Sequence, residues 1–275
     1  MREPVRSAAW LLPLLALAAL LAPWLAPQNP YDLAALDILD ARLPPGSHAG
    51  SGDGVYFLGT DEQGRDLLSA MLYGLRISVG VGVGGTGLAL LAGCAAGLAA
   101  AWHGGFADRL LMRLADLQLA FPALLVALVL LALLGPGLGK VVIALALSQW
   151  AYFARAMRAA ALVEIGHDYI AAARLAGVSG RSIALRYLLP NCLPTLAAVL
   201  PVQLAAAITL EATLSFLGLG TPATEPSLGR LVANGYPYLL AGKYWISLFP
   251  GAALVLAIAA CNLAATPLAP PRRPA

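Results

Sequence analysis

The chain has 275 residues, of which 60% are hydrophobic and 11% are charged, and its mean hydropathy is +0.79. Soluble domains carry roughly 45–50% apolar and about 25% charged residues, so a water-soluble fold could not bury this much apolar side chain or cover its surface with charge. The net charge is only +3, without a basic stripe carrying interleaved aromatic residues. The composition therefore predicts an integral membrane protein and no nucleic-acid partner.

Stretches without charged residues mark the candidate membrane spans, because a helix needs about 20 apolar residues to cross a bilayer. In chain order, the long stretches cover residues 7–31, 77–102, 117–139, 187–210 and 244–271. A further stretch, 141–154, is shorter. The guanidinium groups of Arg155 and Arg158, which follow it, can reach the membrane surface from inside a span, and the glycine-rich residues 135–139 before it can lengthen the helix. We therefore predict an all-α polytopic protein with six transmembrane helices.

The first stretch, 7–31, follows Arg2 and Arg6, as the apolar core of a secretory signal peptide would. However, three prolines interrupt it, and no small-x-small cleavage pattern stands out. We expect an uncleaved membrane anchor. With the polar, Pro- and Gly-rich loop that follows, it forms the first predicted domain, residues 1–70.

The basic residues indicate how the chain is oriented. If the N-terminus is cytoplasmic, the cytoplasmic segments hold eleven of the 17 Lys and Arg residues: Arg2, Arg6, Arg109, Arg113, Arg155, Arg158, Arg174, Arg181, Arg186, Arg272 and Arg273. Cytoplasmic loops of membrane proteins are enriched in Lys and Arg, which favours both termini in the cytoplasm. The second predicted domain is then a transmembrane domain over residues 71–268, and residues 269–275 form a short cytoplasmic tail.

Glycines recur in the second predicted span. The run 80–85 reads Gly-Val-Gly-Val-Gly-Gly and formally matches a dinucleotide-binding fingerprint, but that fingerprint works only between a strand and the start of a helix. Here the run lies inside an apolar span. We interpret Gly80 and Gly84, and likewise Gly93 and Gly97, as pairs spaced to allow close helix contact.

No pattern in the sequence indicates catalysis or a bound cofactor. Gly139-Lys140 lacks the other residues of a phosphate-binding loop, so we expect this chain to bind no ATP. His48, His103 and His167 fall in different loops without metal-ligand spacing. No predicted span carries a Ser and His, or a pair of Asp, suited to intramembrane proteolysis. We predict no catalytic residue, no cofactor site and no metal site.

Glu211 is the acidic residue that falls within an apolar stretch. A carboxylate at membrane depth is costly unless it faces a cavity or a partner, which makes Glu211 a candidate passage-lining residue. The alternative is that it lies at the outer membrane interface and is simply hydrated. The sequence leaves both readings open.

The segment 168–190 is polar, rich in alanine and arginine, and favours helix on both sides of Gly177. Physically it predicts a short helix, a glycine turn and a second helix that ends at Pro190 before the next span. Alanines give a smooth face that another protein can approach closely. Gly177 can adopt the left-handed backbone conformation that ends a helix.

With these residues the chain resembles the permeases of binding-protein-dependent ABC importers, whose cytoplasmic loop reads Glu-Ala-Ala, three residues, Gly, nine residues, and then an apolar residue, x, Leu-Pro. The matching residues are Ala172, Ala173, Gly177, Leu189 and Pro190. Ala171 stands where the family has glutamate, and Tyr187 where it has an apolar residue. The segments 58–66, 74–78 and 214–220, and the pair Asn262-Leu263, resemble the second permease of the dipeptide, oligopeptide and nickel subfamily.

This resemblance implies a type I ABC importer permease fold in a bacterial cytoplasmic (inner) membrane. It implies a homologous second permease, two ATPase subunits that bind the ATP, and an extracytoplasmic solute-binding protein as partners. The matched residues of segment 168–190 would couple ATP hydrolysis in those subunits to alternating access. This chain would itself be non-catalytic.

The resemblance leaves the solute open among dipeptides, oligopeptides, nickel complexes, and glutathione-like or sugar-like solutes. Two other classes of membrane protein would need residues of their own. A stand-alone secondary transporter needs acidic residues for its coupling ion, and Glu211 is the available one. An intramembrane enzyme needs a catalytic group at depth, and we find none.

Overall fold

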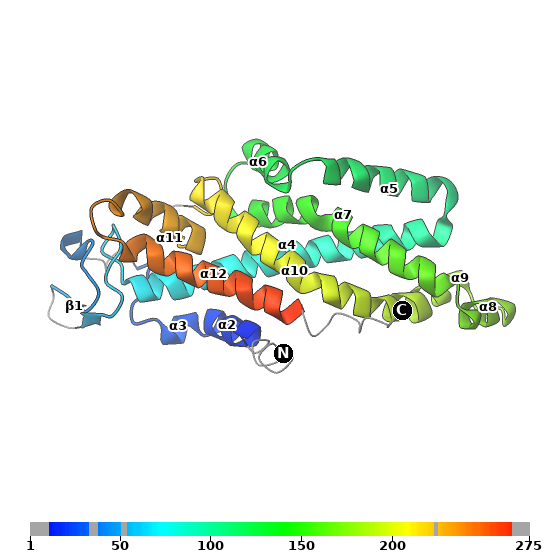
Figure 1. The fold of residues 1–275 in the computed structure, drawn as a ribbon, viewed down its shortest axis with the longest axis horizontal. Coiled ribbons are helices and arrows are strands. Elements are labelled where there is room, and N and C mark those ends of the chain that lie inside the picture. Colours follow the sequence, from blue (N-terminus) through cyan, green and yellow to red (C-terminus); the bar gives the residue numbers. More distant parts are fainter. Residues whose placement is uncertain (1–10, 33–37, 51–53, 223–224, 266–275) are drawn as a thin grey trace, which may run out of the picture.

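The computed structural model describes residues 11–32, 38–50, 54–222 and 225–265. It is an elongated helical bundle in which long helices run side by side along the molecule (Figure 1). The long helices are α4 (Leu67–His103), α7 (Leu138–Ile165), α10 (Leu189–Phe216) and α12 (Trp245–Ala265). Next to them lie α2 (Leu11–Leu20), α3 (Ala22–Leu25), α5 (Gly105–Ala120) and α6 (Ala123–Leu134).

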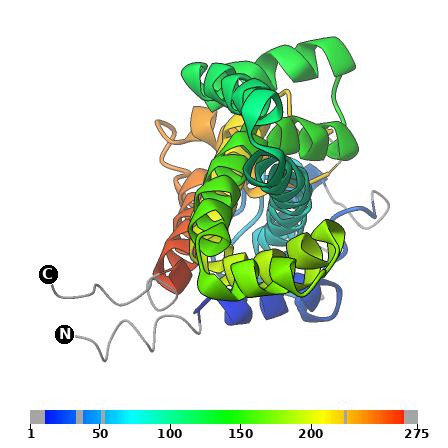
Figure 2. The same cartoon turned by 90° about the vertical axis from the view of Figure 1, so that its right-hand side faces the viewer.

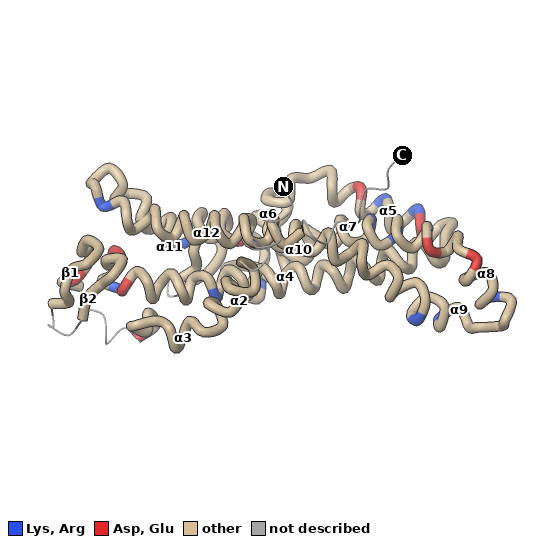
Figure 3. Tube along the Cα trace, turned by 60° about the horizontal axis from the view of Figure 1, so that its bottom comes forward, with Lys and Arg blue, Asp and Glu red and all other residues tan. Residues whose placement is uncertain are grey.

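The two ends of the bundle differ. One end, called here the hairpin end, carries η2 (Ile38–Asp40), the antiparallel strands β1 (Ser47–His48) and β2 (Val55–Tyr56), α11 (Leu228–Gly235) and η4 (Tyr236–Tyr238). The other, the α8 end, carries α8 (Asp168–Leu175), α9 (Gly180–Ser182) and the π-type turns of η3 (Ile183–Leu188). Lys, Arg, Asp and Glu gather toward both ends (Figure 3). This distribution fits a bundle whose middle lies in lipid.

Of the described helices, three are long and apolar enough to cross a membrane: α4, the continuous helical run 180–216, and α12. The bent pair of α5 and α6 would make a fourth. The six predicted spans are therefore not confirmed. The described part of the first predicted span consists of α2 and α3, of 10 and 4 residues, with Pro23 in the first turn of α3. The predicted tail, 269–275, lies outside the described residues.

The third predicted span, 117–139, is wrong as a single helix. It begins inside α5, and α5 and α6 meet at an angle of 93°. The break falls at Phe121-Pro122, where Phe121 has an extended backbone (φ −95°, ψ 142°). Proline lacks an amide hydrogen, and its ring disfavours the helical conformation of the residue before it. One proline thus turns a uniformly apolar stretch into two helices.

Two other predicted spans are longer in the structure than in the sequence analysis. The short stretch 141–154 lies within α7, which has 28 residues and passes through Arg155 and Arg158 without interruption. The stretch 77–102 lies within α4, which starts at Leu67 because the Asp66 carboxylate accepts a hydrogen bond from the Ser69 amide (2.8 Å) and caps the helix. Charged side chains mark the polar part of a helix and need not end it.

Small residues let α4 and α7 pack closely. A Cβ atom at Gly93 would lie 2.6 Å from the Phe153 Cβ, and one at Gly97 would lie 2.8 Å from the Met157 Cβ, so these glycines are required by the contact. The prediction is confirmed for this pair. It is wrong for Gly80, because a Cβ there would meet no atom within 4 Å. A Cβ at Gly84 would make an ordinary van der Waals contact with Val142, at 3.5 Å.

Candidate functional site

The segment 168–190 folds as predicted into a helix, a glycine turn and a second helix, called here the α8–α9 unit. Gly177 has φ +73°, and the amide of Val178 donates to the carbonyl of Ala173 across the turn. Ser179 then caps α9, its hydroxyl accepting from the Ser182 amide. A left-handed glycine just beyond a helix and a serine before the next one are common stop and start signals, and they explain why the turn forms here.

The second helix does not end at Pro190, contrary to the sequence prediction. Helical turns continue from Gly180 through Pro190 to the end of α10. In η3 the pattern widens to π-type turns, and the Leu189 amide donates to the carbonyl of Ala184, five residues back. These wider turns precede the proline, which has no amide hydrogen to donate, and the chain enters α10 without a break. The α8–α9 unit is thus continuous with a long helix.

Apolar packing fixes the unit to two further helices. Its buried residues Ile170, Ala173, Ile183 and Leu188 form one cluster with partly buried residues that include Leu98, Trp102, Ile165 and Val178. Leu98 and Trp102 belong to α4, and Ile165 ends α7. The Arg174 guanidinium lies 5.4 Å from the centre of the Trp102 ring, a cation–π arrangement. Viewed from this end, the unit lies across the bundle (Figure 2).

A hydrogen-bonded chain of side chains ties the unit to α7 and α10 as well. The Tyr169 hydroxyl donates to a Glu164 carboxylate oxygen (2.5 Å), and the Asn191 side-chain amide donates both to the Tyr169 hydroxyl (3.2 Å) and to the Tyr187 carbonyl (2.8 Å). Partial burial, together with the neighbouring Glu164 carboxylate, raises the pKa of Tyr169 to about 12. The hydroxyl therefore stays protonated at physiological pH and can donate.

The five residues predicted for this site separate into two groups. Ala172 and Gly177 are exposed, and a Cβ atom added at Gly177 would meet nothing within 4 Å. Ala173 instead faces the cluster beneath α8, and Leu189 packs against the apolar core of the bundle. Pro190 is exposed in the first turn of α10. The open face of the unit is therefore formed by α8 and its turn.

Sequence reasoning missed Leu175, Trp102, Tyr169 and Asn191. Leu175 ends α8 and is 91% exposed, next to the alanines at 171, 172 and 176, which are exposed as well. Together, Leu175 and these alanines form a small apolar surface on the open face of α8. Its position in the last turn of the predicted helix, two residues before Gly177, is the signal that could have revealed it. The partners of Trp102 and Asn191 depend on tertiary packing.

Glu211 lies in the hairpin half of the bundle and is fully buried. One carboxylate oxygen, Oε1, accepts from the Ser215 hydroxyl (2.7 Å), and the hydroxyls of Ser78 and Ser227 face the same carboxyl group. The other oxygen, Oε2, has no hydrogen-bond partner among the described residues. The simply hydrated alternative is inconsistent with this burial. The carboxyl also lines no open surface here, so its passage-lining role stays a prediction.

The residues around Glu211 come from three elements. Ser78 belongs to α4, Ser215 to α10, and Ser227 caps α11 through its hydroxyl. The Ser78 hydroxyl also accepts from the Leu228 amide (3.4 Å). A Cβ atom at Gly229 would collide with the backbone of Ala212, so α11 is pressed against α10 at this level. The carboxyl group therefore lies where three elements meet.

Metal-ligating side chains do not gather in the described parts of the chain. No group of three or more His, Cys, Asp or Glu residues there could hold a metal ion. His48 lies in β1, His103 at the end of α4, and His167 before α8.

Residues 85–269 match the family described as binding-protein-dependent transport system inner membrane components. A putative peptide transport system permease protein of Brucella suis biovar 1 (strain 1330) is 43% identical, covering 95% of this chain and 84% of the relative. The di/tripeptide transport system permease protein DppC of Pseudomonas aeruginosa (strain UCBPP-PA14) is 37% identical over 91% of this chain and 81% of the relative. The dipeptide permease protein DppC of Escherichia coli (strain K12) is also 37% identical, over 89% and 80%.

Among solved structures, an inward-facing conformation of the MetNI methionine ABC transporter aligns with a TM-score of 0.59 at 19% sequence identity. The alignment covers 73% of this chain and 95% of that chain. At this identity the likeness concerns the fold.

Proposed function

The chain belongs to the family of binding-protein-dependent transport system inner membrane components, and from this premise we propose that it is a permease subunit of an ATP-driven importer of di- or oligopeptides. The long apolar helices are the membrane-spanning part of this machine. The substrate class is supported by the names of the relatives, which are peptide, di/tripeptide and dipeptide permeases. Nickel complexes are the second candidate.

The observation that carries the proposal is the attachment of the α8–α9 unit. Its open face is an exposed alanine surface with Leu175 at its edge, and its inner side contacts α4, α7 and α10 at once. A displacement of α8 would therefore move α4, α7 and α10 together. A packed cluster and a hydrogen-bonded chain transmit such a movement as a rigid unit, which is what alternating access requires.

The proposed partners follow from the family. Two ATPase subunits would dock on α8 and hold the ATP, so this chain would bind no cofactor and hydrolyse nothing itself. A homologous second permease would complete the passage, and an extracytoplasmic binding protein would deliver solute at the hairpin end. The charged α8 end, with Arg155, Arg158, Arg174, Arg181 and Arg186, would face the cytoplasm.

Uptake by the reconstituted transporter tests the proposal. The chain is placed in liposomes with the subunits that co-purify with it, ATP is enclosed, and the binding protein with a labelled dipeptide is added outside. We expect dipeptide accumulation that requires ATP and stops when this chain is omitted. Accumulation of a nickel complex but not of the dipeptide would replace the substrate class, and uptake driven by an ion gradient without ATP would contradict the importer assignment.

The proposed orientation predicts the accessibility of two exposed positions. In a version without native cysteines, His48→Cys in β1 should react with an impermeant thiol reagent added outside the cell, because the hairpin end is extracytoplasmic. Ser179→Cys, at the start of α9, should react only after the membrane is opened. Both side chains are exposed, so the two sites report access to the reagent and serve as controls for each other. Labelling of both from one side would refute the orientation.

A further inference from the structure

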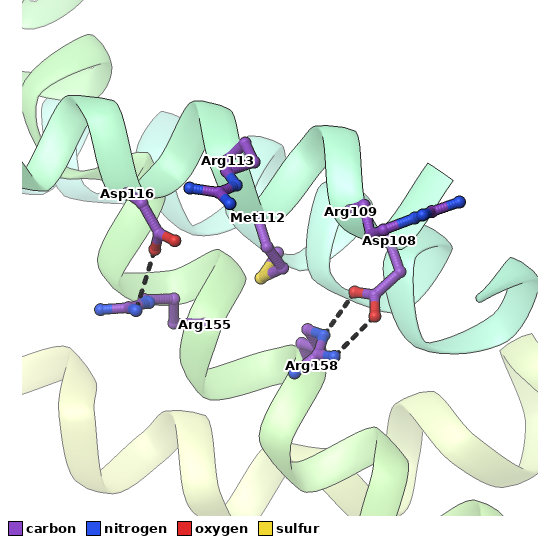
Figure 4. Close-up of a pocket in the computed structure, with 7 residues that line it drawn as sticks. All are labelled: Asp108, Arg109, Met112, Arg113, Asp116, Arg155 and Arg158. Carbon is purple, nitrogen blue, oxygen red and sulfur yellow. Dashed lines mark hydrogen bonds and ion pairs between the residues drawn. The ribbon is translucent and has the colours of Figure 1, made fainter. Parts of the chain in front are cut away.

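A cavity of about 450 Å³ lies between α5 and α7 (Figure 4), in the part of the bundle toward the α8 end (Figure 1). Its lining is charged apart from one methionine: Asp108, Arg109, Met112, Arg113, Asp116, Arg155 and Arg158. Four guanidinium groups and two carboxylates share this space, so the cavity is net positive. The proposed coupling of α8 to the spans makes no use of it.

Two of these arginines are paired across the cavity. Arg158 binds Asp108 through two parallel hydrogen bonds, from Nε to Oδ1 (2.5 Å) and from Nη2 to Oδ2 (2.6 Å). Arg155 Nη2 lies 2.9 Å from Asp116 Oδ1. Both carboxylates are thereby neutralised, and the pairs hold α5 against α7. The cavity keeps two positive charges beyond these pairs.

Those two charges belong to Arg109 and Arg113. Both residues are exposed, and neither forms an ion pair with a carboxylate in the described parts of the chain. The Arg109 Nε donates to the Gly105 carbonyl of its own helix (3.2 Å). The remaining donors of Arg109 and the guanidinium of Arg113 are free to bind an anion, and an arginine presents its donors in a fork that matches phosphate oxygens.

The position of these arginines on α5 points to the kind of anion. At 3.6 residues per turn, Arg109 and Arg113 share one edge of the helix. On one side of this edge is the face toward α7, with Asp108, Met112 and the buried Ala115. On the other side is an apolar stripe left uncovered in this chain, whose exposed residues are Phe106 (74%), Leu110 (48%), Leu114 (47%) and Leu117 (60%).

We propose that this cavity and stripe bind an anionic phospholipid of the cytoplasmic leaflet. Arg109 and Arg113 hold the headgroup phosphate, and the acyl chains lie along the apolar stripe of α5. Basic pockets between helices at the cytoplasmic membrane surface recognise anionic headgroups in this way. A soluble phosphate would gain nothing from the stripe, which is why a lipid fits better. The inference rests on the proposed orientation and is independent of the transported solute.

The headgroup charge should decide which lipid is retained. An arginine near an anionic membrane surface strengthens binding about fivefold, so two arginines together give about 30-fold. The full chain, purified with the subunits that accompany it, is exchanged into mixed micelles with equal amounts of phosphatidylglycerol and phosphatidylcholine. Native mass spectrometry then counts the retained lipids. We expect phosphatidylglycerol to be retained in preference, and Arg109→Gln/Arg113→Gln to remove the preference.

A matched control removes the same charge elsewhere. Arg181→Gln/Arg186→Gln changes two exposed arginines of the α8–α9 unit, outside this cavity. Whatever this change does to docking of the ATPase, it should leave the lipid preference intact. Arg109→Lys/Arg113→Lys keeps the charge and should retain most of the preference. Equal retention of both lipids by the unaltered chain would overturn the proposal even if a variant failed to fold.

Two further results would also overturn the proposed occupant. If glycerol 3-phosphate displaced phosphatidylglycerol at equal concentration, the site would recognise a soluble phosphate. If the preference were present in the isolated chain and absent from the assembled transporter, a protein subunit would cover the stripe. Uptake of dipeptide is measured after part of each preparation is reconstituted into liposomes, so failure of the lipid site is distinguished from failure of the transport function.

Discussion

Replacing Gly177 by valine is expected to leave the chain in the membrane and to abolish uptake. The residue has φ +73°, where a side chain costs roughly 1–2 kcal/mol, and no atom lies within 4 Å of an added Cβ. The fold of this chain therefore has room for the valine at the cost of local strain. An ATPase docked against the turn would not have that room. The measurement is co-purification of the ATPase with the variant, together with uptake of labelled dipeptide.

A second left-handed glycine separates strain from docking. Gly242 has φ +75° and equally open surroundings, but it lies at the hairpin end. Gly242→Val should carry the same strain and keep its hold on the ATPase. If Gly177→Val kept both the ATPase and uptake, the coupling role of the α8–α9 unit would be wrong. If both variants lost the ATPase, backbone strain rather than docking would explain the loss.

Replacing Glu211 by glutamine is expected to slow uptake about tenfold or more without preventing assembly. Glutamine has the shape of glutamate, but its side-chain amide replaces one acceptor oxygen by a donor, and a buried polar group left without a partner costs about 1–3 kcal/mol. The carboxyl group accepts from Ser215 of its own helix α10, and it faces the hydroxyls of Ser78 in α4 and Ser227 at the start of α11. We propose that these elements separate during alternating access and that a passage reaches Glu211 only then. Initial uptake rates, with the amount of chain in the membrane, measure the effect.

A neighbouring polar residue of α10 provides the control. The Thr209 hydroxyl donates to the Ala205 carbonyl of its own helix (2.8 Å), so Thr209→Val removes a polar group without uncoupling helices. It should transport normally. Glu211→Leu removes all polarity and leaves the Ser215 hydroxyl without its acceptor, so its uptake is compared per amount of chain in the membrane. If Glu211→Gln and Glu211→Leu both transported at the normal rate, Glu211 would have no role in transport.

Much of the candidate site was predictable because its signals are local. A glycine after an alanine-rich helical segment predicts a left-handed stop, and Gly177 adopts it. The spacing of Gly93 and Gly97 likewise predicted a close contact, which α7 supplies. Gly80 and Gly84 have the same spacing, but a Cβ at Gly80 would meet nothing and one at Gly84 would make only ordinary contact with Val142. Spacing marks one face of a helix, and the neighbours of that face are set by the fold.

The sequence by itself determined that the chain is an all-helical membrane protein and where its helices can start or stop, since apolar length, glycine and capping residues act within a few residues of themselves. It did not determine whether a helix ends or continues at a charged residue or a proline. Only the tertiary structure showed that α7 continues past Arg155 and Arg158 and that acids of α5 pair with both of them. It also showed that Glu211 is buried where its own helix meets α11 and the sequence-distant α4. Burial and pairing of charge depend on neighbours brought together by folding, and no local pattern contains them.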